Sequence, residues 1–204
     1  AKDFNPQTKA ELSAITRSEQ VVAIGECGLD FNRNFSTPNE QLFALEQQLI
    51  LACDLGLPVF LHERDAFEAQ IELLTKYRKE LKGGVVHCFT GNVEQMNHYL
   101  DLGLYIGITG WVCDLKRGES LRDAVKFLPL NRILLETDAP YLRPKGLANN
   151  RKLDNGNNEP AYLPYIAGEV ANIMATDITT LQVASEANTQ ALFNISSNSA
   201  GHVK

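Results

Sequence analysis

Short apolar runs recur along the chain, and a segment with apolar residues at helical spacing follows each of them. The runs do not alternate with polar residues, which is typical of strands that are buried on both faces. Strands and helices that alternate in this way form parallel sheets with right-handed crossovers. The pattern therefore predicts an α/β fold with strands at 21–26, 58–62, 84–88, 104–109 and 132–137.

Helix signals separate the predicted strands. Thr37-Pro38-Asn39-Glu40 combines an N-cap threonine, a proline at the first helical position and a glutamate at the third, and Gly56 is typical of a helix end. Asp65-Ala66-Phe67-Glu68 predicts a second start of the same kind, with Asp65 as the cap. Further helices are predicted within 1–20, after Gly91-Asn92, near 118–128, over about 160–175 and from Asp177, with a long loop over 139–158.

Four of the predicted strands run into a residue that is able to bind a metal, namely Glu26, His62, His87 and Asp138. In parallel α/β sheets the functional groups gather at the C-terminal ends of the strands. One histidine at a strand end is more often a hydrogen-bonded core residue than a ligand. Two imidazoles and two carboxylates at such ends form a combination that suits a divalent cation, so we expect a metal site.

Composition adds limits to this interpretation. The 204 residues, 44% of them hydrophobic, suffice for a sizeable core, and we expect one domain over 1–204. A net charge of −6 gives no general attraction to nucleic acid, so a polyanion would need a local basic patch or a bound cation. The four cysteines form no C-x-x-C pair, and no apolar run reaches the ~18 residues of a membrane span. We expect reduced thiols, no membrane contact and a cytoplasmic location.

Some polar residues have two interpretations. Arg64 lies on the same strand face as His62 if the strand continues, and it either binds a phosphate or pairs with a neighbouring carboxylate. Lys145 and Arg151, in the long loop, either contact a polyanion or are simply solvated. Trp111 either stacks on a base or covers the end of the sheet.

Six motifs stand at the predicted strand ends and in the loops: Gly25-Glu26-Cys27-Gly28-Leu29-Asp30, His62-x-Arg64-Asp65, His87-Cys88-Phe89-Thr90-Gly91, Gly107-Ile108-Thr109-Gly110-Trp111-Val112-Cys113-Asp114, Glu136-Thr137-Asp138-Ala139-Pro140-Tyr141 and Asn158-Glu159-Pro160. Together they resemble the motifs of the TatD family of metal-dependent deoxyribonucleases. The resemblance covers about residues 10–195.

The resemblance implies a TIM-barrel fold of the (β/α)8 type and a metal-dependent hydrolase. It implies hydrolysis of phosphodiester bonds by a 3′→5′ exonuclease that acts on single-stranded DNA and RNA, with a role in DNA repair. The implied cofactor is one or two divalent cations, Mg²⁺ first and Mn²⁺ or Zn²⁺ as alternatives. By position, Glu26, His62 and His87 match the family's metal ligands, and Asp138 matches the aspartate that binds metal or activates water.

Roles are expected for the remaining candidates as well. Glu26 and Asp138 are the expected catalytic residues. The expected partner is a single-stranded DNA or RNA substrate, and we expect a monomer. Substrate contacts are expected at Arg64, Lys145, Arg151 and Glu159.

The number of predicted strands departs from the family pattern. A closed barrel has eight strands, whereas the pattern here predicts five, and the His-x-His that many members carry on the first strand does not occur. Either the first three strand–helix units, about 60 residues at ordinary unit length, are absent from this chain, or the protein is a shortened relative. We favour the first interpretation, and both leave the second metal position open.

Two other functions fit the same residues. A metal-dependent amidase or lactonase of the amidohydrolase superfamily would keep the metal site and act on a small molecule; a tight apolar pocket would favour it, and an open groove flanked by Arg and Lys would favour a nuclease. An inactive interaction module without a closed site is the non-enzymatic alternative.

Overall fold

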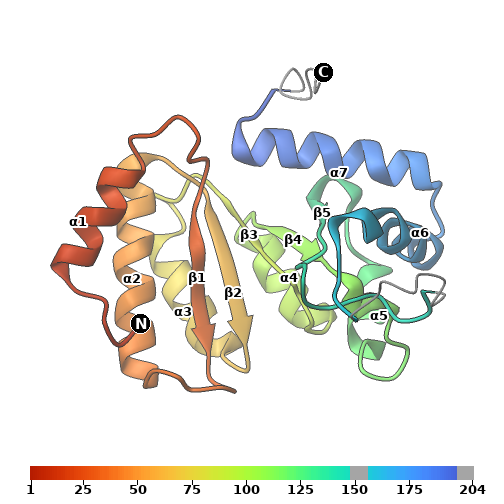
Figure 1. The fold of residues 1–204 in the computed structure, drawn as a ribbon, viewed down its shortest axis with the longest axis horizontal. Helices are drawn as coiled ribbons and strands as arrows, with labels where there is room; N and C mark the ends of the chain where they lie inside the picture. Colours follow the sequence, from red (N-terminus) through yellow and green to blue (C-terminus); the bar gives the residue numbers. More distant parts are fainter. Residues whose placement is uncertain (148–155, 197–204) are drawn as a thin grey trace. The chain divides into compact units, whose positions relative to one another are not determined.

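A computed structural model of the chain describes residues 1–147 and 156–196. Contacts between residues divide the chain into two compact units, one built from Ala1–Val86, Leu102–Leu104 and the residues from Thr189 on, the other from His87–Asp101 and Tyr105–Asn188. The expectation of one domain stays a prediction. The elements (Figure 1) are α1 (Pro6–Ile15), β1 (Ile24–Asp30), α2 (Pro38–Leu55), β2 (Val59–Arg64), α3 (Phe67–Tyr77), β3 (Gly84–Val86), α4 (Val93–Asp101), β4 (Tyr105–Ile108), α5 (Glu119–Val125), β5 (Ile133–Leu135), α6 (Leu163–Met174) and α7 (Ile178–Phe193), with short 3-10 turns at Gly110–Cys113, Leu130–Arg132 and Pro160–Tyr162.

The first unit contains β1, β2 and β3, which are parallel and follow one another in sequence order. Leu61 of β2 pairs with Cys27 on one side and with Val86 on the other. Figure 1 shows α2 and α3 on the same side of the β1–β2 pair, with α1 outside α2. Fully buried Leu29, Leu49 and Leu61 lie in this core, because apolar side chains gain stability when they leave water.

Local signals of the sequence explain how α2 begins and ends. The Thr37 hydroxyl accepts a hydrogen bond from the Glu40 backbone N–H, and the Glu40 carboxylate accepts one from the Thr37 N–H. At the other end, Gly56 has a left-handed backbone (φ 61°) that most other residues adopt only at a cost. The predicted start and end of this helix are therefore confirmed.

The predicted start of α3 is wrong in one respect. Its N-cap residue is Ala66, with no side-chain capping bond. Asp65 has a left-handed backbone (φ 53°), and its carboxylate accepts a hydrogen bond from Asn32 Nδ2 at 2.7 Å. The backbone N–H of Ala66 donates instead to Glu63 Oε1 at 2.8 Å. Asp65 thus binds the loop after β1 rather than the end of α3.

The second unit contains β4 and β5, a parallel pair that matches Ile106 with Ile133 and Ile108 with Leu135. Helix α4 packs against β4, and α6 packs against β5. Two polar side chains of α7 bind the β5 region: Ser185 Oγ accepts from the Leu135 N–H at 3.0 Å, and Asn188 Nδ2 donates to the Ile133 carbonyl at 2.8 Å. Buried polar groups need such partners.

Several strand boundaries differ from the predicted ones; β2 continues past His62 to Arg64, and β5 ends at Leu135. Two further differences concern β1 and β3. Strand β1 begins at Ile24 and continues to Asp30, because residues 27–30 pair with β2 and Val21 is held in a turn by Ser18. Strand β3 ends at Val86, since Cys88 has a left-handed backbone (φ 47°). Both differences depend on pairing and backbone geometry that a run of apolar residues does not reveal.

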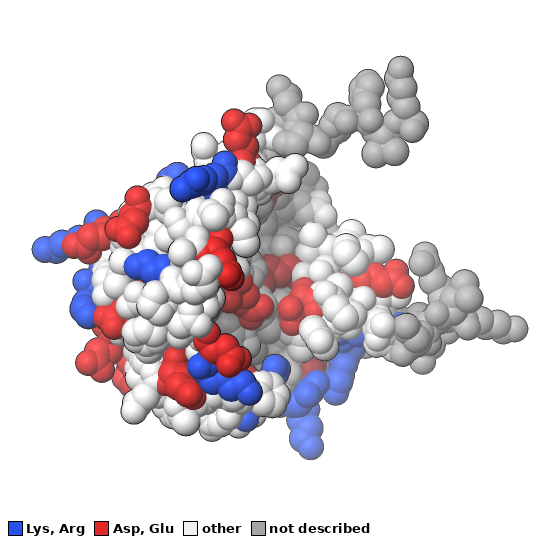
Figure 2. Space-filling view, turned by 60° about the vertical axis from the view of Figure 1, so that its left-hand side comes forward, with Lys and Arg blue, Asp and Glu red and all other residues white. Residues whose placement is uncertain are grey.

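Charges of both signs mix on the face that Figure 2 shows, where Lys and Arg side chains lie scattered among Asp and Glu. This agrees with a net charge of −6, and a nucleic acid would not meet a broadly basic surface on this face. Within the ranges 1–147 and 156–196, no helix is long and apolar enough to cross a membrane.

Candidate metal centre

Glu26 lies inside β1, where the strand is irregular. The register between β1 and β2 shifts between Ile24 and Cys27, and such a bulge changes the direction in which a side chain points. The half-exposed Glu26 carboxylate lies 2.9 Å from Nδ1 of His62 on the neighbouring strand. The prediction that Glu26 is the last residue of its strand is therefore wrong, since β1 continues to Asp30, but the residue does meet a second predicted ligand.

The imidazole of His62 lies between two carboxylates. Besides the contact of Nδ1 with Glu26, its Nε2 lies 3.6 Å from Oδ2 of Asp30. The other oxygen of Asp30 accepts hydrogen bonds from the backbone N–H groups of Asn32 (3.0 Å) and Arg33 (2.8 Å). Asp30 belongs to the first motif but received no role from the sequence. Its position at the end of β1, next to the strand of His62, is the signal that points to it.

Gln41 of α2 holds the end of β1 in place. Its Oε1 accepts a hydrogen bond from the Asp30 N–H at 2.8 Å, and its Nε2 donates to the carbonyls of Asp30 (3.0 Å) and Ser36 (2.9 Å). The side chain is buried, so these bonds are shielded from competing water. The helix thereby determines where the Asp30 carboxylate lies.

Gly28 allows β1 and β2 to approach each other closely beside the site. It pairs with His62 and has a φ of +151°. A Cβ at this position would lie 1.9 Å from the carbonyl oxygen of His62. Any larger residue would therefore push apart the two strands that carry Glu26 and His62.

His87 directly follows Val86, the last residue of β3, and is buried. One ligand atom from each of Glu26, His62 and His87 lies within 4.8 Å of the others. One carboxylate and two imidazoles are donors that Zn²⁺ and Mn²⁺ accept readily, and a hard cation such as Mg²⁺ would take the carboxylate together with water. These three residues form a candidate metal site, and their chemistry fits a divalent cation.

Glu136 is a site residue that the sequence analysis did not single out. It follows β5, and its Oε2 lies 3.2 Å from Nδ1 of His87 and accepts a hydrogen bond from the Cys88 N–H at 3.2 Å. The available signal is that Glu136 is the first polar residue after the apolar run of β5. The ligand predicted at this strand end was Asp138, two residues later.

Asp138 lies in the loop after β5 and has a left-handed backbone (φ 57°), a strained conformation that recurs at functional sites. Its carbonyl accepts a hydrogen bond from Tyr141 N–H at 2.8 Å. Buried Asn158 holds the same loop, since its Nδ2 donates to the Thr137 carbonyl at 2.6 Å. Asp138 is outside the group formed by Glu26 and the two histidines, and its catalytic role stays a prediction.

The predicted substrate contacts have different surroundings. Arg64 is exposed at the end of β2 and, within the described part of the chain, forms no ion pair with Glu63 or Asp65. Glu159 is exposed beside buried Asn158. Arg151 lies outside the described residues.

Lys145 belongs to a charged cluster centred on Asp114. Oδ2 of Asp114 lies 2.9 Å from Lys145 Nζ and 2.6 Å from Arg117 Nε. The Arg117 guanidinium in turn lies over the Trp111 ring, 4.5 Å from its centre. The hydrogen bond from Lys145, followed by bonds from the Arg117 backbone and side chain, holds the pKa of the Asp114 carboxyl well below its usual range. Asp114 therefore orients two exposed cations and an aromatic ring.

Two groups on the strands that carry Glu26 and His62, the Cys27 thiol and the Glu63 carboxyl, have shifted pKa values. Burial raises the pKa of the Cys27 thiol to about 12, with a further contribution from the charge of Glu26. Cys27 therefore remains a neutral thiol near pH 7, and a neutral thiol is a poor metal ligand. Burial likewise raises the pKa of Glu63, against the effect of its hydrogen bond from Ala66.

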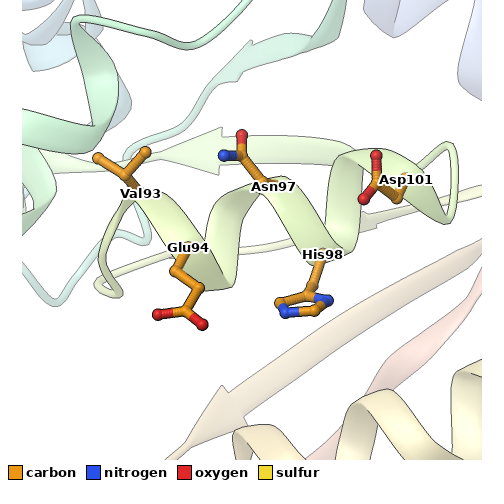
Figure 3. Close-up of a pocket in the computed structure, with 5 residues that line it drawn as sticks. All are labelled: Val93, Glu94, Asn97, His98 and Asp101. Carbon is orange, nitrogen blue, oxygen red and sulfur yellow. The ribbon is translucent and has the colours of Figure 1, made fainter.

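A separate pocket lies along α4 and is lined by Val93, Glu94, Asn97, His98 and Asp101 (Figure 3). Glu94 and His98, one helical turn apart, point to the same side of the helix. None of these five residues was predicted to belong to a site. Among the described residues, the lining of this pocket does not include Glu26, His62 or His87.

Comparison with known proteins connects these observations. The family model described as TatD related DNase matches residues 1–194. A 3'-5' ssDNA/RNA exonuclease TatD of Klebsiella pneumoniae (strain 342) is 48% identical over 195 residues, which is 96% of this chain and 73% of the relative. That of Cronobacter sakazakii is 49% identical over 193 residues, 95% of this chain and 73% of the relative. The present chain thus spans about three quarters of the length of these relatives.

Solved structures agree. The crystal structure of YJJV, a TatD homologue from Escherichia coli K12, has a TM-score of 0.82 at 29% identity and covers 95% of this chain and 72% of its own. A TatD family hydrolase from Entamoeba histolytica has a TM-score of 0.79 at 27% identity and covers 94% of this chain and 69% of its own. The expected α/β fold with parallel strands, of the TIM-barrel type, is confirmed by these similarities. The chain belongs to the family of TatD-related DNases.

Proposed function

We propose that this chain is a 3′→5′ exonuclease that hydrolyses phosphodiester bonds of single-stranded DNA and RNA with the help of a divalent cation. The observation that carries the proposal is the convergence of Glu26, His62 and His87 on one point, with ligand atoms within 4.8 Å of one another. The names of relatives that are 48% and 49% identical supply the reaction and the substrate. We expect the cation to be Mg²⁺.

The cation would be held by the Glu26 carboxylate and by one nitrogen from each of His62 and His87. When bound, it would make an attacking water more acidic and stabilise the negative charge that develops on the phosphate. Asp30 and Glu136 contact the two imidazoles at 3.6 Å and 3.2 Å, and such outer contacts orient metal ligands. Gly28 allows β1 and β2 to pair closely at His62, and Gln41 holds the end of β1 at Asp30.

For the remaining chemistry we propose four side chains that the sequence singled out. Asp138 is our candidate to accept the proton of the attacking water, a role that requires only hydrogen-bond reach. Exposed Arg64 and Lys145 are candidates for phosphate contacts, because their cations are accessible. Trp111, oriented through Arg117, is a candidate to stack on a base, an interaction that tolerates any sequence.

The test is digestion of single-stranded DNA and RNA oligonucleotides that carry a label at the 5′ or the 3′ end, with Mg²⁺, with Mn²⁺ or with EDTA. A 3′→5′ exonuclease releases the 3′ label at once and shortens the 5′-labelled strand stepwise. Full activity in EDTA would contradict the metal site. Digestion that begins at the 5′ end or inside the strand would contradict the polarity.

The small-molecule alternative is tested in the same preparation with amide and lactone substrates; turnover of these, with intact oligonucleotides, would replace the nuclease by an amidase or lactonase. A role in DNA repair, a cytoplasmic location and a monomeric state stay predictions. The role in DNA repair is tested by exposing cells that lack the gene to an oxidant. Their survival is compared with and without the Glu26→Ala variant.

A further inference from the structure

Glu136 is held against His87 from several directions. Its backbone N–H donates to the Ile108 carbonyl at 2.9 Å, which ties the residue to β4. Its Oε2 accepts a hydrogen bond from the Cys88 N–H at 3.2 Å and lies 3.2 Å from Nδ1 of His87. Both side chains are largely shielded, with 14% of Glu136 and 7% of His87 exposed. The imidazole and the carboxylate therefore meet in a fixed geometry.

The space for this carboxylate exists because residue 107 is a glycine. A Cβ on Gly107 would lie 1.9 Å from Oε1 of Glu136 and 2.5 Å from its carboxyl carbon. The glycine itself is fixed, since its carbonyl accepts a hydrogen bond from Phe89 N–H at 3.0 Å. Strand β4 thus provides a gap that the Glu136 carboxylate fills.

The burial of the Glu136 carboxylate does not by itself stabilise the fold. Oε1 of Glu136 is buried, and no group among the described residues forms a hydrogen bond with it. A buried oxygen without such a partner destabilises a fold, so a carboxylate is a poor choice if its only task is to fill space. The contact of Oε2 with the His87 ring gives it a different task.

We propose that Glu136 is a positioning residue that keeps the hydrogen of the neutral His87 imidazole on Nδ1, so that Nε2 is the nitrogen that offers its lone pair to a cation. An ionised carboxylate only accepts hydrogen bonds, and the neutral imidazole has one donor and one acceptor nitrogen. Facing Oε2, Nδ1 must be the donor. Carboxylates in this relation to a metal-binding histidine fix the ring and raise its basicity. The inference rests on the proposed metal site but concerns a residue outside its ligands.

The first experiment reads the tautomer directly, in the cation-free full chain. Nitrogen-15 NMR of the histidine side chains distinguishes Nδ1–H from Nε2–H, and the spectrum of a His87→Gln variant identifies the signals of His87. The expected result for the natural sequence is Nδ1–H. Glu136→Leu should lose this preference, whereas Glu136→Gln should keep it, because the amide oxygen still accepts the hydrogen bond. A His87 ring with its hydrogen on Nε2 in the natural sequence would overturn the proposal.

The second experiment measures Mn²⁺ binding by calorimetry. Glu136→Leu should weaken it about 10- to 100-fold, the range for loss of such an outer contact, and Glu136→Gln should weaken it less. Gly107→Ala should resemble Glu136→Leu, because its methyl group displaces the carboxylate while leaving Glu136 in the chain. Glu94→Gln, an exposed change on α4, is the matched control and should bind as the natural sequence does.

The outcomes separate the two proposals. If the natural sequence binds no Mn²⁺, the metal site fails, and the NMR result still decides whether Glu136 sets the tautomer. If the natural sequence binds Mn²⁺ and Glu136→Leu binds it equally well, the metal site stands and the positioning role of Glu136 is wrong. Circular dichroism of each variant shows whether the fold is kept; should Glu136→Leu not fold, Gly107→Ala and the tautomer of the natural sequence carry the decision.

Discussion

Oε1 of Glu26 lies 2.9 Å from Nδ1 of His62, although the two residues are on different strands. A one-residue irregularity of β1 brings the carboxylate to the imidazole. The pair matters because it joins two of the three candidate metal ligands, one from each of two neighbouring strands.

We therefore expect Glu26→Ala to reduce nuclease activity more than the ~100-fold that the loss of an outer contact costs a metal site. The change removes the one carboxylate among the three candidate ligands. Initial rates on a 3′-labelled single strand in Mg²⁺ measure it. Glu72→Ala, an exposed change on α3 of the same unit, is the control. A Glu26→Ala variant that digests at the rate of the control would show that Glu26 is not a ligand.

Gln41→Met should destabilise the first unit, because it removes two hydrogen bonds to the backbone of Asp30 and one to the Ser36 carbonyl, and it leaves the Asp30 N–H without this acceptor. At about 0.5–1.5 kcal/mol per bond, the free energy of unfolding should fall by about 1.5–4.5 kcal/mol. Urea unfolding followed by circular dichroism measures the change.

The matched control is Gln48→Met in the same helix, which loses a single bond to the Ala44 carbonyl of its own helix. It should lower the free energy of unfolding by no more than about 1.5 kcal/mol. Equal losses for Gln41→Met and Gln48→Met would mean that the clamp on Asp30 contributes nothing.

Gly28→Ala should disrupt the β1–β2 pair, since its methyl carbon would lie 1.9 Å from the His62 carbonyl oxygen. Gly56→Ala provides the contrast: Gly56 also has a positive φ, but no atom lies within 4 Å of its added Cβ. Its cost is the backbone conformation alone, about 1–2 kcal/mol. Gly28→Ala should therefore unfold at clearly lower urea concentration than Gly56→Ala and should lose Mn²⁺ binding. A loss of stability no larger than that of Gly56→Ala would contradict the close approach of β1 and β2 at Gly28.

The alternation of strands and helices could be predicted from the sequence because its signals are local. Apolar runs mark the strands, and the reciprocal bonds of Thr37 and Glu40 lie within one turn of α2. The start of α3 could not be predicted in the same way. Asp65 has the residue type of a cap, but its left-handed backbone turns it toward Asn32 in another loop.

The candidate site was predictable in part for the same reason. Glu26, His62 and His87 were found because each stands at or near the end of an apolar run. Asp30 and Glu136 were missed because their roles depend on contacts across strands, with His62 and with His87 respectively. No spacing along the chain indicates that the Glu136 carboxylate fits into the gap at Gly107.

The last prediction concerns Asp114 and pH. Bonds from Lys145 and Arg117 lower the pKa of this carboxyl in the folded chain, so the folded state favours the ionised form more than the unfolded state does. The resulting stability is present above the ordinary aspartate pKa of ~3.9 and is lost as the pH falls through that value toward the lower pKa of the folded state. Asp114→Asn should therefore unfold more easily than the natural sequence near pH 7, and the difference should shrink as the pH falls below about 4.

The control is Asp123→Asn, which removes an exposed ion pair between Asp123 of α5 and Lys126. Its stability should change little at either pH. Urea midpoints at the two pH values decide the matter, and a difference for Asp114→Asn that stays constant between them would show that the ion pairs with Lys145 and Arg117 do not stabilise the fold.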